Sequence, residues 1–142
     1  MGVELPQAAV DFIVEQAPLG HIVTLDEDGS AHVTVAWFDA DADGLVFATL
    51  FDQRKLQNLR RDPRVVVSFE AADANEVGML HYMVIDGRAE VSEGGAPELL
   101  AELAARYVGS GADFPPMDDP PPGYLTRITP TRVRGIGPWA DD

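Results

Sequence analysis

The chain alternates between segments with the two-residue period of a β-strand and segments with the longer period of a helix. Two β-branched runs within residues 20–38 flank Asp28-Gly29, a dipeptide that readily takes the positive φ angles of a tight hairpin. A second pair, Asp43-Gly44, precedes the next apolar run. The other strand-like segments are residues 45–50, 64–70, 80–92 with a bend or bulge at Gly87, and 125–137. The pattern predicts about six antiparallel strands, connected mostly as meanders.

Three segments carry the helical pattern instead, and they are residues 6–17, 53–61 and 96–108. The second begins after Asp52, a candidate N-terminal cap, and ends at Asp62-Pro63, because proline disfavours helical backbone in the residue before it. A stretch rich in proline and glycine follows the third helix and predicts an extended loop. We therefore expect a mainly β (α+β) fold, an antiparallel β-barrel, closed or split, with flanking helices, as one domain over residues 1–142.

Composition supports a single globular domain, since 46% of the 142 residues are hydrophobic and only 24% are charged. There is no cysteine, which excludes disulfides and thiolate metal sites and fits a reducing cytoplasm. The chain lacks a secretion signal pattern and any apolar run near the roughly 18 residues that a membrane span needs. The net charge of -14 argues against nucleic acid or an anionic membrane as the main partner. We expect a cytoplasmic protein that acts on a small molecule.

Against this acidic background, five of the ten basic residues crowd between Arg54 and Arg64, among them the only lysine, Lys55. Arg54 and Lys55 open the predicted helix, where free backbone N–H groups and the positive end of the helix dipole favour an anion. Arginine offers bidentate hydrogen bonds and lysine a mobile point charge, a pair suited to a phosphomonoester. The later arginines are better explained as partners of neighbouring acids.

Several stretches together carry a family resemblance. They are the Asp-Gly turn, "HVTVAWF", "LVFATL", "RKLQNLRRDPRV" and "VIDGRAEV". In this order they resemble the pyridoxamine 5'-phosphate oxidase-like split β-barrel superfamily, and within it the deazaflavin (coenzyme F420)-dependent oxidoreductases. The resemblance implies a six-stranded split barrel of the FMN-binding type. It also implies a homodimer with the cofactor in the dimer groove, where Trp139 and the proline-rich loop would cover the partner's site.

The resemblance also implies a set of cofactor-binding residues. Arg54 and Lys55 would bind the phosphate, and Ala48 and Thr49 would lie against the ribityl chain or the phosphate. The backbone of the strand Thr34, Val35, Ala36 and Trp37 would run along the ring. Tyr82 would touch the cofactor from another strand. Deazaflavin members often have an arginine two residues before the lysine. Here Gln53 holds that position, while Arg54 adjoins Lys55 as in FMN oxidases. Both F420 and FMN therefore remain candidate cofactors.

The expected function is hydride transfer from reduced F420 to an unsaturated small molecule. The alternatives are an FMN-dependent oxidase or reductase and a flavin-binding or storage protein without turnover. No catalytic residue is assigned, because the cofactor carries the redox chemistry. Three histidines, His21, His32 and His81, lie on separate predicted strands without metal-ligand spacing, so no metal site is expected. His32 or His81 is an alternative proton donor near the cofactor.

Overall fold

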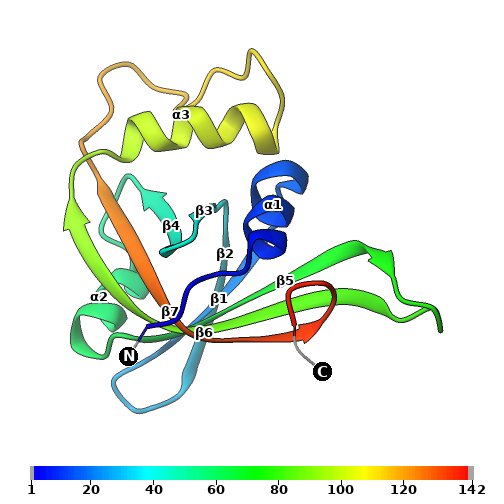
Figure 1. The fold of residues 1–142 in the computed structure, drawn as a ribbon. Coiled ribbons are helices and arrows are strands. Elements are labelled where there is room, and N and C mark those ends of the chain that lie inside the picture. The colour runs from blue at the N-terminus through cyan, green and yellow to red at the C-terminus, as the bar shows by residue number, and fades with distance from the viewer. Residues whose placement is uncertain (1, 141–142) are drawn as a thin grey trace.

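A computed structural model describes residues 2–140 of the protein (Figure 1). Its elements follow in the order α1 (Gln7–Gln16), β1 (Gly20–Leu25), β2 (Ala31–Ala36), β3 (Asp39–Asp41), β4 (Gly44–Thr49), α2 (Arg54–Arg61), β5 (Arg64–Ala74), β6 (Leu80–Glu93), α3 (Ala96–Tyr107) and β7 (Tyr124–Ile136). All three predicted helices are present within one residue of the predicted bounds at either end. No helix in the described range is long and apolar enough to cross a membrane.

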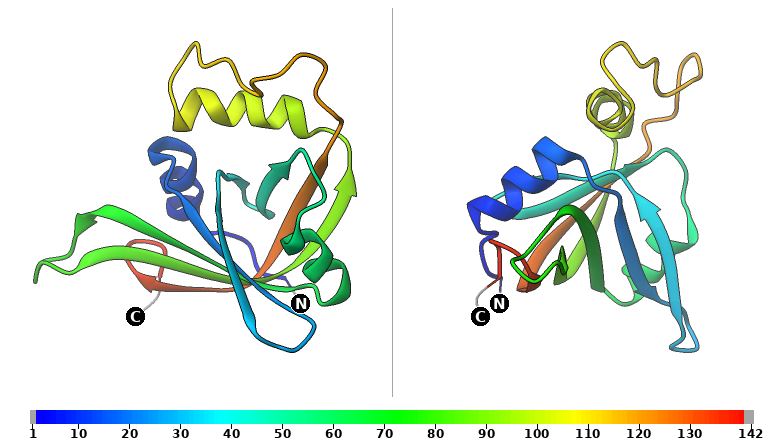
Figure 2. Two further views of the ribbon diagram at one scale, coloured as in Figure 1. Left: turned by 180° about the vertical axis from the view of Figure 1, so that it is seen from behind. Right: turned by 90° about the vertical axis from the view of Figure 1, so that its right-hand side faces the viewer.

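The strands form one antiparallel sheet in the order β2-β1-β5-β6-β7-β4-β3. The sheet curls strongly, but its edge strands β2 and β3 do not pair, so the sheet stays open (Figure 2). The mainly β antiparallel fold with three helices is confirmed, but the prediction of a six-stranded split barrel was wrong in strand number, because the structure has seven strands in an unclosed sheet. The seventh strand is β3, whose sequence Asp-Ala-Asp has no strand pattern and which pairs with β4 through Ala40 and Leu45.

Two other boundaries differ from the sequence prediction. The strand predicted over residues 64–70 is longer in the structure, because β5 continues to Ala74, which pairs with Leu80 of β6. Pairing along the long β6 strand outweighs the weak strand propensity of alanine and aspartate here. Asp52 does not cap α2, because it accepts a hydrogen bond from Arg60 at 2.8 Å, and α2 begins without a side-chain cap. The expected irregularity at Gly87 is confirmed as a register shift between β6 and β7.

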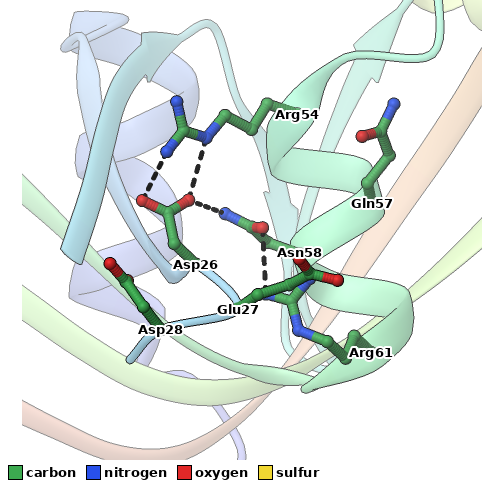
Figure 3. Close-up of a pocket in the computed structure, with 7 residues that line it drawn as sticks. All are labelled: Asp26, Glu27, Asp28, Arg54, Gln57, Asn58 and Arg61. Atoms are coloured by element: carbon green, nitrogen blue, oxygen red, sulfur yellow. Dashed lines mark hydrogen bonds and ion pairs between the residues drawn. The ribbon is translucent and has the colours of Figure 1, made fainter. Parts of the chain in front are cut away.

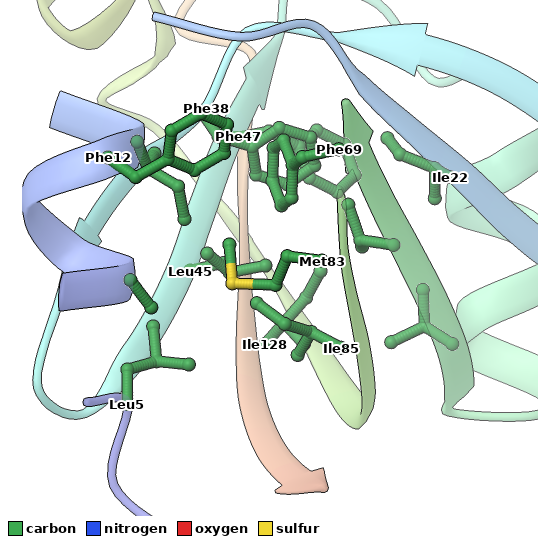
Figure 4. Close-up of a cluster of buried hydrophobic side chains, with 14 of the residues drawn as sticks. Leu5, Phe12, Ile22, Phe38, Leu45, Phe47, Phe69, Met83, Ile85 and Ile128 are labelled. Carbon is green, nitrogen blue, oxygen red and sulfur yellow. The ribbon is translucent and has the colours of Figure 1, made fainter. Parts of the chain in front are cut away.

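Aromatic side chains fill the interior of the curled sheet (Figure 4). Phe38 packs edge-on against Phe47 and Phe69, with ring centroids 5.6 and 5.3 Å apart. Gly20 on β1 allows this packing, since a Cβ at that position would overlap the Phe38 ring. Trp139 packs on Phe12 of α1 at 4.8 Å and is only 6% exposed. Trp139 thus belongs to the core of its own chain.

The helix α3 lies beside the end of the sheet that holds β4, with the proline-rich loop beyond it (Figure 1). Its C-terminal residues attach it to the sheet. Arg106 donates to the Asp39 carboxylate at 2.7 Å, and the Tyr107 hydroxyl donates to the Pro18 carbonyl at 2.7 Å. Together α2 and α3 border the gap between the two ends of the sheet, where the candidate site lies.

Candidate functional site

A pocket of about 330 Å³ lies where β2, near one end of the sheet, approaches β4, near the other. Six of its lining residues are ones that the sequence predicted as cofactor-binding: Val35, Ala36, Trp37, Ala48, Thr49 and Lys55. The other six lining residues were not among the predicted cofactor-binding residues: Leu19, Leu50, Phe51, Gln53, Leu100 and Phe114. The open sheet thus brings together side chains that are distant along the chain.

Lys55 is the only cation that lines this pocket. The first turn of α2 turns its side chain inward, so the residue is 6% exposed. Its Nζ lies 5.5 Å from the centroid of the Phe47 ring, and no residue in the range 2–140 gives it an ion pair or hydrogen bond. Burial lowers the pKa of Lys55, because removal from water disfavours the ammonium form. The Lys55 ammonium lines a pocket that is open to solvent and has no anionic partner among the described residues, so it is the kind of group that an incoming anion would stabilise.

Thr49 lines the pocket beside it, at the end of β4. The residue is 7% exposed, and its hydroxyl is buried with no hydrogen-bond partner among the described residues. Buried hydroxyl groups are rarely left unpaired. The start of β7 runs close to this point, because Gly123 has no Cβ that would overlap the Thr49 carbonyl. Two residues of the pocket lining thus carry polar groups without partners among the described residues, the ammonium of Lys55 and the buried hydroxyl of Thr49.

The start of α2 adds to this polar end of the pocket. No side chain caps the helix, so its first backbone N–H groups remain free of side-chain acceptors. Free N–H groups at a helix start favour an anion, and the helix dipole acts in the same direction. Lys55, Thr49 and this helix start make up a donor set suited to a phosphate group.

Much of the remaining pocket lining is apolar and aromatic. Trp37 and Phe114 line it with their rings 5.2 Å apart, and Leu100 of α3 adjoins them. Leu19 and Phe51 also line the pocket and are more than half exposed, so the pocket communicates with solvent. Phe114 comes from the proline-rich loop, which the resemblance assigned to a partner's site. In this structure the loop lines the pocket of its own chain.

Arg54 lies in a separate pocket of about 700 Å³, which Lys55 does not line (Figure 3). Its Nε and Nη2 donate to the two Asp26 carboxylate oxygens at 2.9 and 2.6 Å. Asn58 donates to the same carboxylate at 2.9 Å, and its own side-chain oxygen accepts from Arg61. These bonds tie α2 to the turn between β1 and β2. The predicted phosphate pair is therefore divided, with Lys55 in one pocket and Arg54 in the other.

Asp26 is the centre of this second cluster. Hydrogen bonds from Arg54 and then from Asn58 lower the pKa of Asp26 to about 2, so the carboxylate stays charged at neutral pH. Its side chain is 13% exposed, whereas that of Arg54 is 62% exposed. Two further acids, Glu27 and Asp28, also line this pocket. The negative groups offset the arginines, so the cluster is a weaker candidate for binding an anion than the Lys55 pocket.

Two other predicted residues lie outside the Lys55 pocket. Thr34 faces the interior on β2 with a buried, unpaired hydroxyl, and Tyr82 lies on β6, where it is 42% exposed. The alternative proton donors are also elsewhere, since neither His32 nor His81 lines the pocket. His81 is edge-on to Trp139 with ring centroids 6.0 Å apart.

Comparison with known proteins places this geometry in a family. Residues 5–137 match the sequence model of the pyridoxamine 5'-phosphate oxidase family. The chain belongs to this family. Membership groups it with flavin- and deazaflavin-related oxidoreductases and agrees with the antiparallel sheet and flanking helices described above. A comparison with curated protein sequences gives no significant match.

Solved structures share the fold of this pyridoxamine 5'-phosphate oxidase family member. An F420 reductase is 23% identical with a TM-score of 0.69, covering 87% of this chain and 94% of its own. The conserved hypothetical protein Rv2991 from Mycobacterium tuberculosis is 26% identical with a TM-score of 0.67, covering 94% of this chain and 86% of its own. General Stress Protein 26 from Bacillus anthracis is 18% identical with a TM-score of 0.63, covering 92% of each chain. At these identities the likeness concerns the fold.

Proposed function

We propose that this protein is an oxidoreductase that binds F420 by its phosphate at Lys55 and transfers a hydride to an unsaturated small molecule. The observation that carries the proposal is Lys55, a residue only 6% exposed whose ammonium has no partner among the described residues, in the same pocket lining as Thr49, whose hydroxyl is also unpaired among them. An anion in the pocket would satisfy both groups at once. The F420 reductase of the same fold makes F420 the first cofactor to test.

The pocket fits a ligand with a phosphate at one end and a flat ring at the other. Lys55 and Thr49 would hold the phosphate, and Trp37, Phe114 and Leu100 would pack against the ring. The strand β2 is at the edge of the sheet, so one side of its backbone has no strand partner and can pair with the polar edge of a ring. When bound, the cofactor would supply the hydride. The chain's own residues would bind, orient and shield it.

FMN is the alternative cofactor, and a feature of the pocket favours it. Gln53 lines the pocket with a neutral amide, so Lys55 is the only charged residue in the lining. Deazaflavin members of the family often have an arginine at the position of Gln53, so its absence here favours FMN. Arg54 in this proposal supports the start of α2 through Asp26 and does not contact the phosphate.

We also propose a homodimer, because part of the outer face of the sheet, on β2, β1 and β5, carries exposed valines. Val33, Val23 and Val66 stand opposite one another on β2, β1 and β5. Val33 is 57% exposed, and Val35 on the same strand is 48% exposed. Contiguous exposed apolar residues often mark a protein interface. A second copy of the chain would cover this face beside the pocket mouth.

The decisive experiment titrates the protein with F420 and with FMN, following cofactor fluorescence. Lys55→Ala should weaken binding of the preferred cofactor by about tenfold or more, because it removes a charge-assisted hydrogen bond in a buried site. Arg127→Ala is the matched control, since it removes an exposed cation on β7 that does not line this pocket. Unchanged affinity in Lys55→Ala would contradict the assignment. Reoxidation of the reduced cofactor by enones or quinones would then separate an enzyme from a storage protein.

A further inference from the structure

The hydroxyl of Tyr107 joins three parts of the chain that are distant in sequence. Tyr107 is the last residue of α3. Its oxygen accepts a hydrogen bond from the Phe38 backbone N–H at 3.0 Å and donates to the Pro18 carbonyl at 2.7 Å. Burial raises the pKa of Tyr107, so the hydroxyl keeps the proton that it donates. One side chain thus fixes the approach to β1 and the connection between β2 and β3.

That connection consists of Trp37 and Phe38, which lie outside the strand ladder. Phe38 is fully buried in the core, whereas Trp37 lines the pocket. Without the Tyr107 hydroxyl, the Phe38 N–H would lose the partner that the structure gives it. An unpaired buried N–H is unfavourable enough to displace the backbone that carries it. The position of the Trp37 indole therefore depends on the Tyr107 hydroxyl.

The Trp37 indole is also held by aromatic rings. The Tyr107 ring stacks on it with centroids 5.6 Å apart and an interplanar angle of 17°. Phe114 packs against it at 5.2 Å with an angle of 58°. Only Trp37 and Phe114 of these three rings line the pocket. Tyr107 supports the aromatic wall from behind.

We propose that Tyr107 is a positioning residue, which holds Trp37 as the wall for the ring of the bound cofactor, and that Phe114 completes this wall. The inference rests on the proposed function in one respect, that the ligand carries a flat ring. It adds a division of labour within the pocket. The segment formed by α3 and the following loop determines ring binding, whereas Lys55 and Thr49 determine phosphate binding.

The test compares three ligands on the full chain: FMN, riboflavin, which has the ring without the phosphate, and inorganic phosphate. If F420 binds more tightly, F420 and its phosphate-free riboside replace the first two. Tyr107→Phe should weaken FMN and riboflavin by at least about fivefold and leave phosphate affinity unchanged. Phe114→Leu should act in the same direction. Lys55→Ala should show the reverse pattern, with FMN and phosphate weakened and riboflavin retained.

Tyr124→Phe is the matched control, because the Tyr124 hydroxyl makes no hydrogen bond with any described residue and Tyr124 does not line the pocket. This variant should bind all three ligands as the unaltered protein does. Equal ring affinities in Tyr107→Phe and the unaltered protein would overturn the proposal. An equal loss of ring and phosphate binding would also overturn it, because that pattern indicates a general structural defect.

A second measurement needs no cofactor and keeps the two proposals separable. Tyr107→Phe should lower the fluorescence anisotropy of Trp37 and raise its quenching by acrylamide, with Trp37→Phe variants used to subtract the Trp139 signal. If the unaltered protein binds neither F420 nor FMN, the proposed function fails, and this measurement alone decides the role of Tyr107. Unchanged Trp37 anisotropy in Tyr107→Phe would then refute the positioning role of Tyr107.

Discussion

Replacing Lys55 with methionine should stabilise the cofactor-free protein. The lysine residue is 6% exposed and unpaired among the described residues, and a charge that is partly removed from water without a partner destabilises the fold. The Phe47 ring at 5.5 Å offsets this by only about 0.5–1 kcal/mol, since the distance is near the limit of a cation–π interaction. Methionine keeps the apolar stem and removes the charge. We expect a gain of about 1–2 kcal/mol, because the contact with the Phe47 ring and the remaining solvent access of the pocket offset part of the cost of the charge.

Thermal unfolding followed by circular dichroism measures this effect. For a chain of 142 residues, 1 kcal/mol corresponds to about 3–4 °C in Tm. Cofactor at 100 times its Kd should add about 2.7 kcal/mol to the free energy of unfolding of the unaltered protein and much less to that of Lys55→Met. Lys55→Met should therefore have the higher Tm without cofactor, and the unaltered protein should have the higher Tm with it. Arg127→Met, which removes an exposed cation, is the control and should change neither value appreciably. A lower Tm for cofactor-free Lys55→Met would refute the view of Lys55 as a buried cation awaiting an anion.

Three further predictions concern other parts of the molecule. The pKa of Asp26 is about 2 in the folded protein against an ordinary 3.8, so the charged carboxylate stabilises the fold above pH 4, and this contribution is lost as the pH falls through 2. In denaturant titrations, Asp26→Asn should therefore lose less stability on acidification than the unaltered protein. The same pH profile in both proteins would contradict this. Thr49→Val removes a buried hydroxyl that has no partner among the described residues, so Tm should be unchanged or higher. The same variant should bind the cofactor several-fold more weakly in fluorescence titrations. Full affinity would show that the hydroxyl has no part in binding. Val33→Glu should give monomers in light scattering, because it puts a charge in the proposed interface. Val77→Glu, at an exposed turn, is the control and should remain a dimer. Dimers of Val33→Glu would place the interface elsewhere.

Local pattern was sufficient to predict most of the fold. The glycine turns, the helical stripes and the Asp62-Pro63 stop each act over a few neighbouring residues, and the corresponding elements are present. The strand β3 could not be predicted in this way, because its Asp-Ala-Asp sequence is made a strand only by pairing with β4. The open sheet could not be predicted from local pattern either, because closure depends on whether edge strands that are distant along the chain pair with each other.

The candidate site was predictable only in part, for a related reason. Lys55, Thr49 and the end of β2 lie on elements whose order along the chain resembles the family pattern, and the structure brings them into one pocket. Arg54 precedes Lys55 directly, but adjacent helical residues point in different directions, and Asp26 from another hairpin holds Arg54. Phe114 lies in a proline-rich loop without periodicity, so its place in the pocket required the tertiary fold.

A crystal structure with FMN or F420 bound would test the central claim most directly, through the position of the phosphate. We predict that a phosphate oxygen lies within hydrogen-bond distance of both Lys55 Nζ and Thr49 Oγ1, with the ring against Trp37. A phosphate bound instead in the pocket of Arg54 and Arg61, with Lys55 still unpaired, would contradict it.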